Sequence, residues 1–137
     1  MARELRRKVI SLTKKFPDIE KYRLIQQVVN SARSVTANIA EGYGRFHFQE
    51  NIQFCRIARG SLYETLDHII AAFDDDYLTQ QQFDELKNEI MDCATVLNGY
   101  INYLSSAKKG QRSNLVEEVG ESYSLSIHRD EPFTNID

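Results

Sequence analysis

The chain has 137 residues, of which 42% are hydrophobic and 27% are charged, and its formal net charge is −3 at pH 7. This length predicts one domain with a sizeable buried core. The first residues have no apolar core of signal-peptide length, and the sequence has no apolar run long enough to cross a bilayer. We therefore expect a cytoplasmic protein without a signal peptide or a membrane span.

Charge is distributed unevenly along the chain. Residues 1–59 carry 12 Lys and Arg against 5 Asp and Glu, whereas residues 60–108 carry 2 against 9, and residues 109–137 carry 3 against 6. A near-neutral total therefore conceals a basic N-terminal half and an acidic remainder. Such a basic half is typical of a surface that meets an anionic partner.

Two helices are predicted before the first glycine-rich corner. Residues 3–16 have apolar side chains at helical intervals surrounded by Lys and Arg, which indicates a basic amphipathic helix. Pro17 ends this helix because its ring forces the preceding residue out of helical geometry. A second helix is predicted from about Glu20 to Glu41, with many small residues on one face that allow a neighbouring helix to approach closely.

A tight corner leads into the third helix. Gly42 is expected to adopt the left-handed conformation just past a helix end, and Gly44 to give the chain freedom to reverse direction. The third helix is predicted over residues 48–73. Gly60 lies near its middle, where glycine costs about 1 kcal/mol relative to alanine. We expect close contact with the second helix to explain it, with a backbone kink as the alternative.

The acidic run at residues 74–76 predicts the end of the third helix, because negative charge is unfavourable at a helix C-terminus. Thr79 and Gln82 then form the spacing of a capping box, which marks the start of the fourth helix. Apolar spacing predicts that this helix continues to about Ala107. Beyond residue 108 the composition becomes polar and rich in Ser and Gly.

These elements predict an all-α fold, an antiparallel up-and-down four-helix bundle over residues 1–108. Residues 109–137 are expected to be a largely irregular, polar and acidic tail, flexible or serving as an arm. The third and fourth helices carry more apolar side chains than one bundle seam requires. We therefore expect a homo-oligomer.

Two motifs carry a resemblance to a known family. They are NIAEGYGR at residues 38–45 and RIARGSL at residues 56–62, followed by Glu64. In these the chain resembles the four-helix bundle proteins encoded within intervening sequences of bacterial 23S ribosomal RNA genes, over about residues 5–105. The resemblance implies an up-and-down bundle that forms a homopentamer, and nucleic-acid binding is attributed to the related accessory proteins of diversity-generating retroelements. The chain has Thr36 where this family often has proline.

The residues around the corner form one candidate site, with two interpretations. If these residues form a binding groove, their arginines would pair with phosphates. As a structural network, they would satisfy backbone groups or bridge subunits, since polar groups near a corner need partners in any case. The set is Asn38, Glu41, Gly42, Gly44, Arg45, Arg56, Arg59, Gly60, Ser61 and Glu64.

The basic face of the first helix and the start of the second form the other candidate site. These residues can neutralise phosphates along RNA or DNA, with Tyr22 or Tyr43 stacking on an unpaired base. The alternative is an ordinary solvated helix face. The candidates are Arg3, Arg6, Arg7, Lys8, Lys14, Lys15, Lys21 and Arg23, with Arg33 beside them.

No pattern in the sequence indicates catalysis, a cofactor or a metal site. The three histidines are scattered, and Cys55 and Cys93 occupy apolar positions of separate helices, as expected for reduced core thiols. No small-molecule substrate is indicated. The leading hypothesis is a non-catalytic, oligomeric accessory or adaptor protein that binds RNA, DNA or a nucleoprotein. A protein–protein interaction scaffold without a nucleic-acid role is the alternative.

Overall fold

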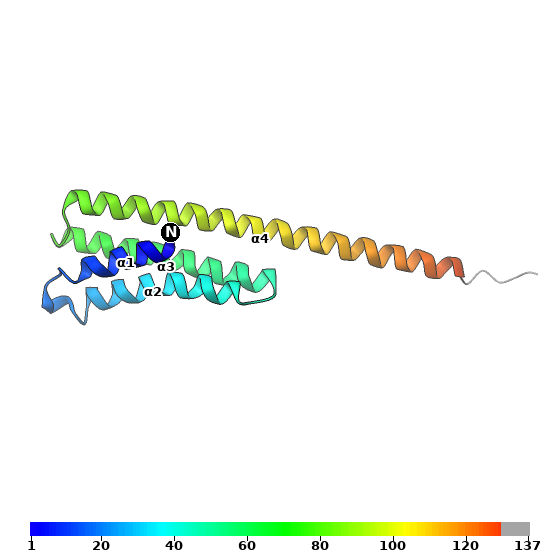
Figure 1. Cartoon of the computed structure of the whole chain (residues 1–137), viewed down its shortest axis with the longest axis horizontal. Helices are drawn as coiled ribbons and strands as arrows, with labels where there is room; N and C mark the ends of the chain where they lie inside the picture. The colour runs from blue at the N-terminus through cyan, green and yellow to red at the C-terminus, as the bar shows by residue number, and fades with distance from the viewer. Residues whose placement is uncertain (130–137) are drawn as a thin grey trace, which may run out of the picture.

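The computed structural model describes the backbone of residues 1–129 and the side chains of residues 1–112 and 114 (Figure 1). Within these residues the chain forms four α-helices and one short 3₁₀ helix, and no strand. The predicted all-α four-helix fold is therefore confirmed. The elements are α1 (Ala2–Thr13), η1 (Asp18–Glu20), α2 (Leu24–Tyr43), α3 (Phe48–Asp74) and α4 (Gln80–Arg129).

The helices run alternately up and down, and α3 packs against both α2 and α4 (Figure 1). The first helix, α1, packs against α2 and α4 and is much shorter than either. One side chain from each helix marks the centre of the core: Val9, Val28, Ile69 and Leu86 are all fully buried. Each such burial stabilises the fold by about 1.5–3 kcal/mol.

The connection between α1 and α2 differs from the prediction. The helix ends at Thr13 rather than near Phe16, because the last amides bond to carbonyls three residues back and Pro17 follows. Phe16 is nevertheless buried, with its ring 5.5 Å from that of Tyr77. The next helix begins at Leu24, whose amide donates to the Glu20 carboxylate at 3.3 Å.

Two of the three glycines that the sequence singled out, Gly42 and Gly60, behave differently from expectation. Gly42 lies inside α2 in a right-handed conformation, so the predicted left-handed conformation is wrong. Its role is close packing: a β-carbon there would lie 2.9 Å from Phe54 Cβ and 3.1 Å from the Asn51 carbonyl oxygen. At Gly60 a β-carbon would meet no atom within 4 Å, so close contact with α2 does not explain that glycine.

The turn between α3 and α4 confirms the sequence prediction. The third helix ends at Asp74, and Asp76 adopts a left-handed conformation with φ of 61°. The Tyr77 amide donates to the Ala72 carbonyl at 2.9 Å, which completes a Schellman motif. The capping box is present, since the Thr79 amide donates to Gln82 Oε1 at 2.9 Å and the Gln82 amide donates to Thr79 Oγ1 at 3.2 Å.

The fourth helix does not end near Ala107 but continues to Arg129, so the largely irregular structure expected after residue 108 is wrong for residues 109–129. Residues 130–137 lie outside the described part of the chain. The sequence allows this continuation, because glycine costs only about 1 kcal/mol in a helix and no proline occurs between Gln80 and Pro132. Apolar residues also recur at every fourth position, at Leu115, Val119, Tyr123 and Ile127.

Candidate nucleic-acid interface

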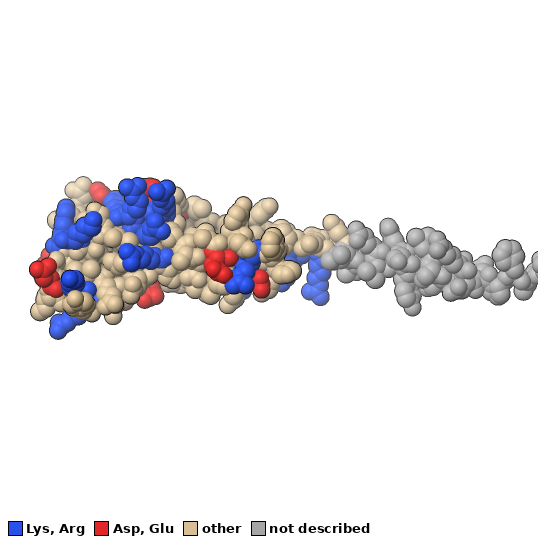
Figure 2. All heavy atoms as spheres, turned by 60° about the horizontal axis from the view of Figure 1, so that its bottom comes forward, with Lys and Arg blue, Asp and Glu red and all other residues tan. Residues whose placement is uncertain are grey.

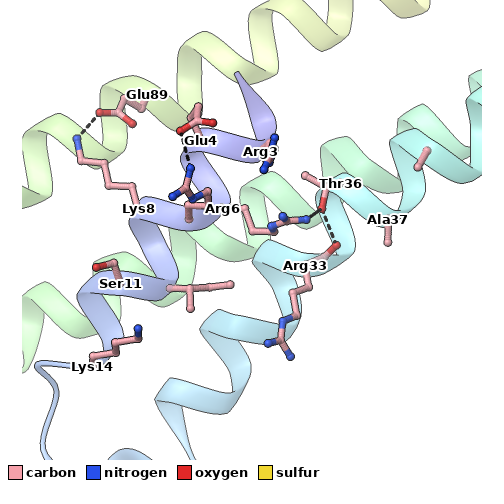
Figure 3. A pocket seen from close by; sticks show the side chains of 13 residues that line it. Arg3, Glu4, Arg6, Lys8, Ser11, Lys14, Arg33, Thr36, Ala37 and Glu89 are labelled. Carbon is pink, nitrogen blue, oxygen red and sulfur yellow. Dashed lines mark hydrogen bonds and ion pairs between the residues drawn. The ribbon is translucent and has the colours of Figure 1, made fainter.

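An open groove of about 1260 Å³ lies between α1 and the middle of α2 (Figure 3). Most of its charged residues are basic. Figure 2 shows Lys and Arg gathered at the end of the bundle that holds α1. The basic lining residues are Arg3, Arg6, Arg7, Lys8, Lys14 and Arg33. The structure therefore brings together five of the eight predicted basic candidates and adds Arg33 from the neighbouring helix.

The amphipathic character of α1 creates this arrangement. Leu5 and Val9 are buried against the bundle, which leaves the basic positions of the same helix facing the solvent and α2. Arg6 fixes the two walls of the groove relative to each other, since its Nη1 donates to Thr36 Oγ1 at 2.8 Å. Thr36 in turn donates to the Arg33 carbonyl at 3.3 Å. A proline at position 36 offers no hydroxyl for this contact.

Some of these positive charges are already paired. Lys8 forms ion pairs with Glu89 and, at 3.5 Å, with Glu85, both on α4. The hydrogen bond that Lys8 donates to the Glu89 carboxylate raises the pKa of Lys8 above its usual value. Arg7 lies 3.8 Å from Glu4 in an exposed pair, a type of interaction that contributes about 0.2–1 kcal/mol. The ion pairs of Lys8 therefore join α1 to α4.

Three basic residues remain available to a ligand. Arg3, Lys14 and Arg33 are exposed, and none forms an ion pair with another side chain in the described part of the chain. They come from both walls of the groove. This is the arrangement needed to contact an anionic backbone along the groove.

The other predicted basic residues lie outside the groove. Lys15 follows the end of α1, Lys21 lies over the Tyr22 ring at 5.5 Å, and Arg23 precedes α2. Tyr22 and Tyr43, the predicted stacking residues, are both highly exposed, but neither lines the groove. The sequence did not predict the contact between Thr36 and Arg6, because these residues lie 30 positions apart.

The residues of the glycine-rich corner form no single cluster. Asn38 Nδ2 donates to the Ser34 carbonyl at 2.8 Å, and Ser34 Oγ lies 2.8 Å from Ser61 Oγ. One turn further along, Thr65 Oγ1 donates to Ser31 Oγ at 3.0 Å. These hydroxyls and the amide thus form a hydrogen-bond network that joins α2 to α3.

The charged residues of that set point to separate partners. Arg45 pairs with Glu41 at 2.7 Å, and its guanidinium lies over the Phe54 ring at 5.2 Å. Arg59 Nη1 donates to Asn98 Oδ1 of α4 at 2.8 Å. The remaining members diverge as well, because Glu64 pairs with His68 on the outer surface of α3, whereas Arg56 lines a different groove, between α3 and α4.

Within the described residues no three His, Cys, Asp or Glu side chains are grouped as metal ligands, and no helix has the length and apolar character to cross a membrane. Cys55 and Cys93 are buried and unbonded to each other, and burial raises the pKa of both thiols.

Comparison with known proteins places the chain in a family. The sequence model described as 23S rRNA-intervening sequence protein matches residues 1–99. The chain belongs to this family. As a 23S rRNA-intervening sequence protein, it is similar in fold to a crystal structure described as a protein with unknown function from the S23 ribosomal protein family of Bacteroides thetaiotaomicron VPI-5482.

That similarity has a TM-score of 0.58 at 21% identity and covers 73% of this chain and 87% of the other. At this identity the likeness shows the fold alone. No curated protein matches this member of the 23S rRNA-intervening sequence protein family. Residues 100–129 of α4 lie beyond the family match.

Proposed function

We propose that this chain is a non-catalytic accessory or adaptor protein that binds nucleic acid through the α1–α2 groove. The observation that carries the proposal is that Arg3 of α1, Lys14 just after α1 and Arg33 of α2 line one open groove, each without an ion-pair partner in the described residues. Contacts of this kind release counterions from a phosphate backbone and recognise little sequence.

We further propose that the protein acts as a homo-oligomer, with five subunits as the number to test. Support comes from large apolar side chains that remain exposed on α3 and α4. These are Ile57, Tyr63, Ile70, Met91, Val96 and Tyr103. In a ring, the basic groove of each subunit would be repeated, and the summed positive field would attract a polyanion more strongly than one copy does.

The test compares two triple variants that remove the same charge. The groove variant carries Arg3→Gln, Lys14→Gln and Arg33→Gln. The control variant carries Lys15→Gln, Lys21→Gln and Arg23→Gln, three basic residues of the same N-terminal region that lie outside the groove. Arg6 is left intact because it joins α1 to α2.

Binding of a single-stranded RNA is measured by fluorescence anisotropy over a series of salt concentrations. The groove variant should reduce the slope of log affinity against log salt by about 2, since each phosphate contact contributes about 0.7. The control variant should change the slope by less than the contribution of one phosphate contact, about 0.7. Equal losses in the two variants would contradict the assignment to the groove. Absence of any RNA or DNA binding would favour the protein–protein scaffold instead.

A further inference from the structure

A second groove, of about 280 Å³, lies between the start of α3 and the outer part of α4. It shares no residue with the α1–α2 groove. Four of its lining residues are basic and none is acidic. The lining consists of Gln49, Ile52, Arg56, Ser105, Lys108, Lys109 and Arg112.

The sequence around these four basic residues supplies no acidic neighbour. On a helix, side chains three or four residues apart are adjacent, and opposite charges at those spacings form the usual surface pairs. None of the four has Asp or Glu at either spacing. Lys108 and Arg112 instead stand four residues apart as like charges, which is mildly destabilising in an isolated helix.

The structure also leaves the two guanidinium groups unpaired. The side chains of Arg56 and Arg112 make no hydrogen bond or ion pair in the described part of the chain. Arg45 and Arg59, by contrast, hydrogen-bond to Glu41 and Asn98 respectively. The groove therefore holds forked donors with no acceptor of their own, one on each of its walls.

One ammonium group of the groove is already held in position. Lys108 on α4 donates a hydrogen bond to Gln49 Oε1 on α3. This contact joins the two walls and fixes one positive charge at the groove. The two amide hydrogens of Gln49 stay available as further donors.

We propose that the α3–α4 groove is an anion site that binds two adjacent phosphate groups. Arg56 and Arg112 supply forked donors from opposite walls, and Lys108 supplies a fixed ammonium. Guanidinium forks match the paired oxygens of phosphate, and several positive charges together favour an anion that carries more than one negative charge. Such a ligand also removes the repulsion between Lys108 and Arg112.

The α3–α4 site does not depend on the proposed role of the α1–α2 groove. Lys108, Lys109 and Arg112 all lie beyond residues 1–99, the part of the chain that matches the family. Two adjacent phosphates occur in small polyphosphates and also in the backbone of a nucleic acid. Inorganic pyrophosphate is the simplest probe, because it carries the shared chemistry without bases or sugars.

The experiment titrates the full chain with pyrophosphate and follows amide and arginine side-chain signals by NMR. The double variant Arg56→Gln/Arg112→Gln is compared with Arg3→Gln/Arg33→Gln, which removes the same charge from the other groove. The site predicts shifts clustered at residues 49–56 and 105–112. It also predicts an affinity loss of about tenfold in the first variant only, as expected for two exposed charge-assisted contacts.

Shifts confined to the α1–α2 groove, or equal losses in the two variants, would overturn the proposal. The titration of the unaltered chain decides the matter even if a variant fails to fold. A second titration adds a short single-stranded oligonucleotide to the pyrophosphate-saturated protein. Reversal of the shifts at residues 105–112 supports the site and identifies a phosphodiester as its ligand. Shifts that persist support the site and identify a small polyphosphate.

Discussion

Replacing Gly42 with alanine has two opposite effects on the free energy of unfolding: a gain in helix propensity and a cost of overpacking. Alanine favours a helix by about 0.5–1 kcal/mol relative to glycine, so propensity alone predicts a more stable protein. The new methyl group, however, would lie 2.9 Å from Phe54 Cβ and 3.1 Å from the Asn51 carbonyl oxygen. Both atoms belong to or adjoin the α3 backbone, so the helix itself has to shift. Overpacking of this kind costs about 1–3 kcal/mol.

The side chain of Asn51 is no freer to move. Its Nδ2 donates to the Tyr100 hydroxyl at 3.1 Å, and its Oδ1 lies 2.9 Å from the position of the added methyl. A shift of Asn51 therefore disturbs the contact between α3 and α4 as well. We expect Gly42→Ala to reduce the free energy of unfolding by about 1 kcal/mol or more, because the overpacking cost exceeds the gain in propensity.

Gly60→Ala is the matched control, since it makes the same change inside a helix where a β-carbon meets nothing within 4 Å. It should raise the free energy of unfolding by about 0.5–1 kcal/mol. Guanidinium unfolding followed by circular dichroism, at one fixed protein concentration, measures both variants. A Gly42→Ala protein as stable as the parent would refute the packing argument. Destabilisation by Gly60→Ala would indicate that another copy occupies that surface.

Three further predictions concern single side chains. Asp76→Gly should raise the free energy of unfolding in guanidinium by about 0.5–1 kcal/mol, because Asp76 holds a left-handed φ of 61° at which a side chain is unfavourable. Glu89→Gln should destabilise the protein at neutral pH by less than about 1 kcal/mol, given the partly exposed pair with Lys8. Since the folded state raises the pKa of Lys8, that pair contributes fully below the usual lysine pKa of 10.5, and the difference should vanish in unfolding curves recorded as pH rises through the folded-state value. Cys55 and Cys93 are buried with raised pKa values, so a thiol reagent at pH 7 should react with them only after denaturant is added, and rapid labelling of the native protein would contradict their placement.

Local chemistry in the sequence was sufficient to predict most of the fold. The capping box at Thr79 and Gln82 and the end of α3 at Asp74 depend on residues within a few positions of each other. The buried stripes of the four helices follow from apolar spacing alone. These features need no knowledge of which helix packs against which.

Features that depend on a partner helix were not predictable in the same way. Gly42 was assigned to a left-handed turn because glycine is common there, whereas its actual constraint is the approach of Phe54 and Asn51 from α3. The basic face of α1 was identified correctly as a set of charges. The partial neutralisation of this face was not predicted, because the contact between Lys8 and Glu89 joins residues 81 positions apart.

The α3–α4 groove illustrates the same limit. Arg56 and Arg112 lie in segments that the sequence assigned to a bundle helix and to an irregular tail, so nothing suggested that they face one groove. They line the same groove only because α4 continues through residue 108 without a break. The length of one helix thus decides whether this basic cluster exists.

The unbroken fourth helix also sets a distance. Residues 108–129 extend it past Leu104, the last buried side chain among those described, and at 1.5 Å per residue they reach about 33 Å. Figure 1 shows this part of α4 extending beyond the ends of the other helices. The end of α4 at Arg129 therefore lies well beyond the bundle that carries the α1–α2 groove.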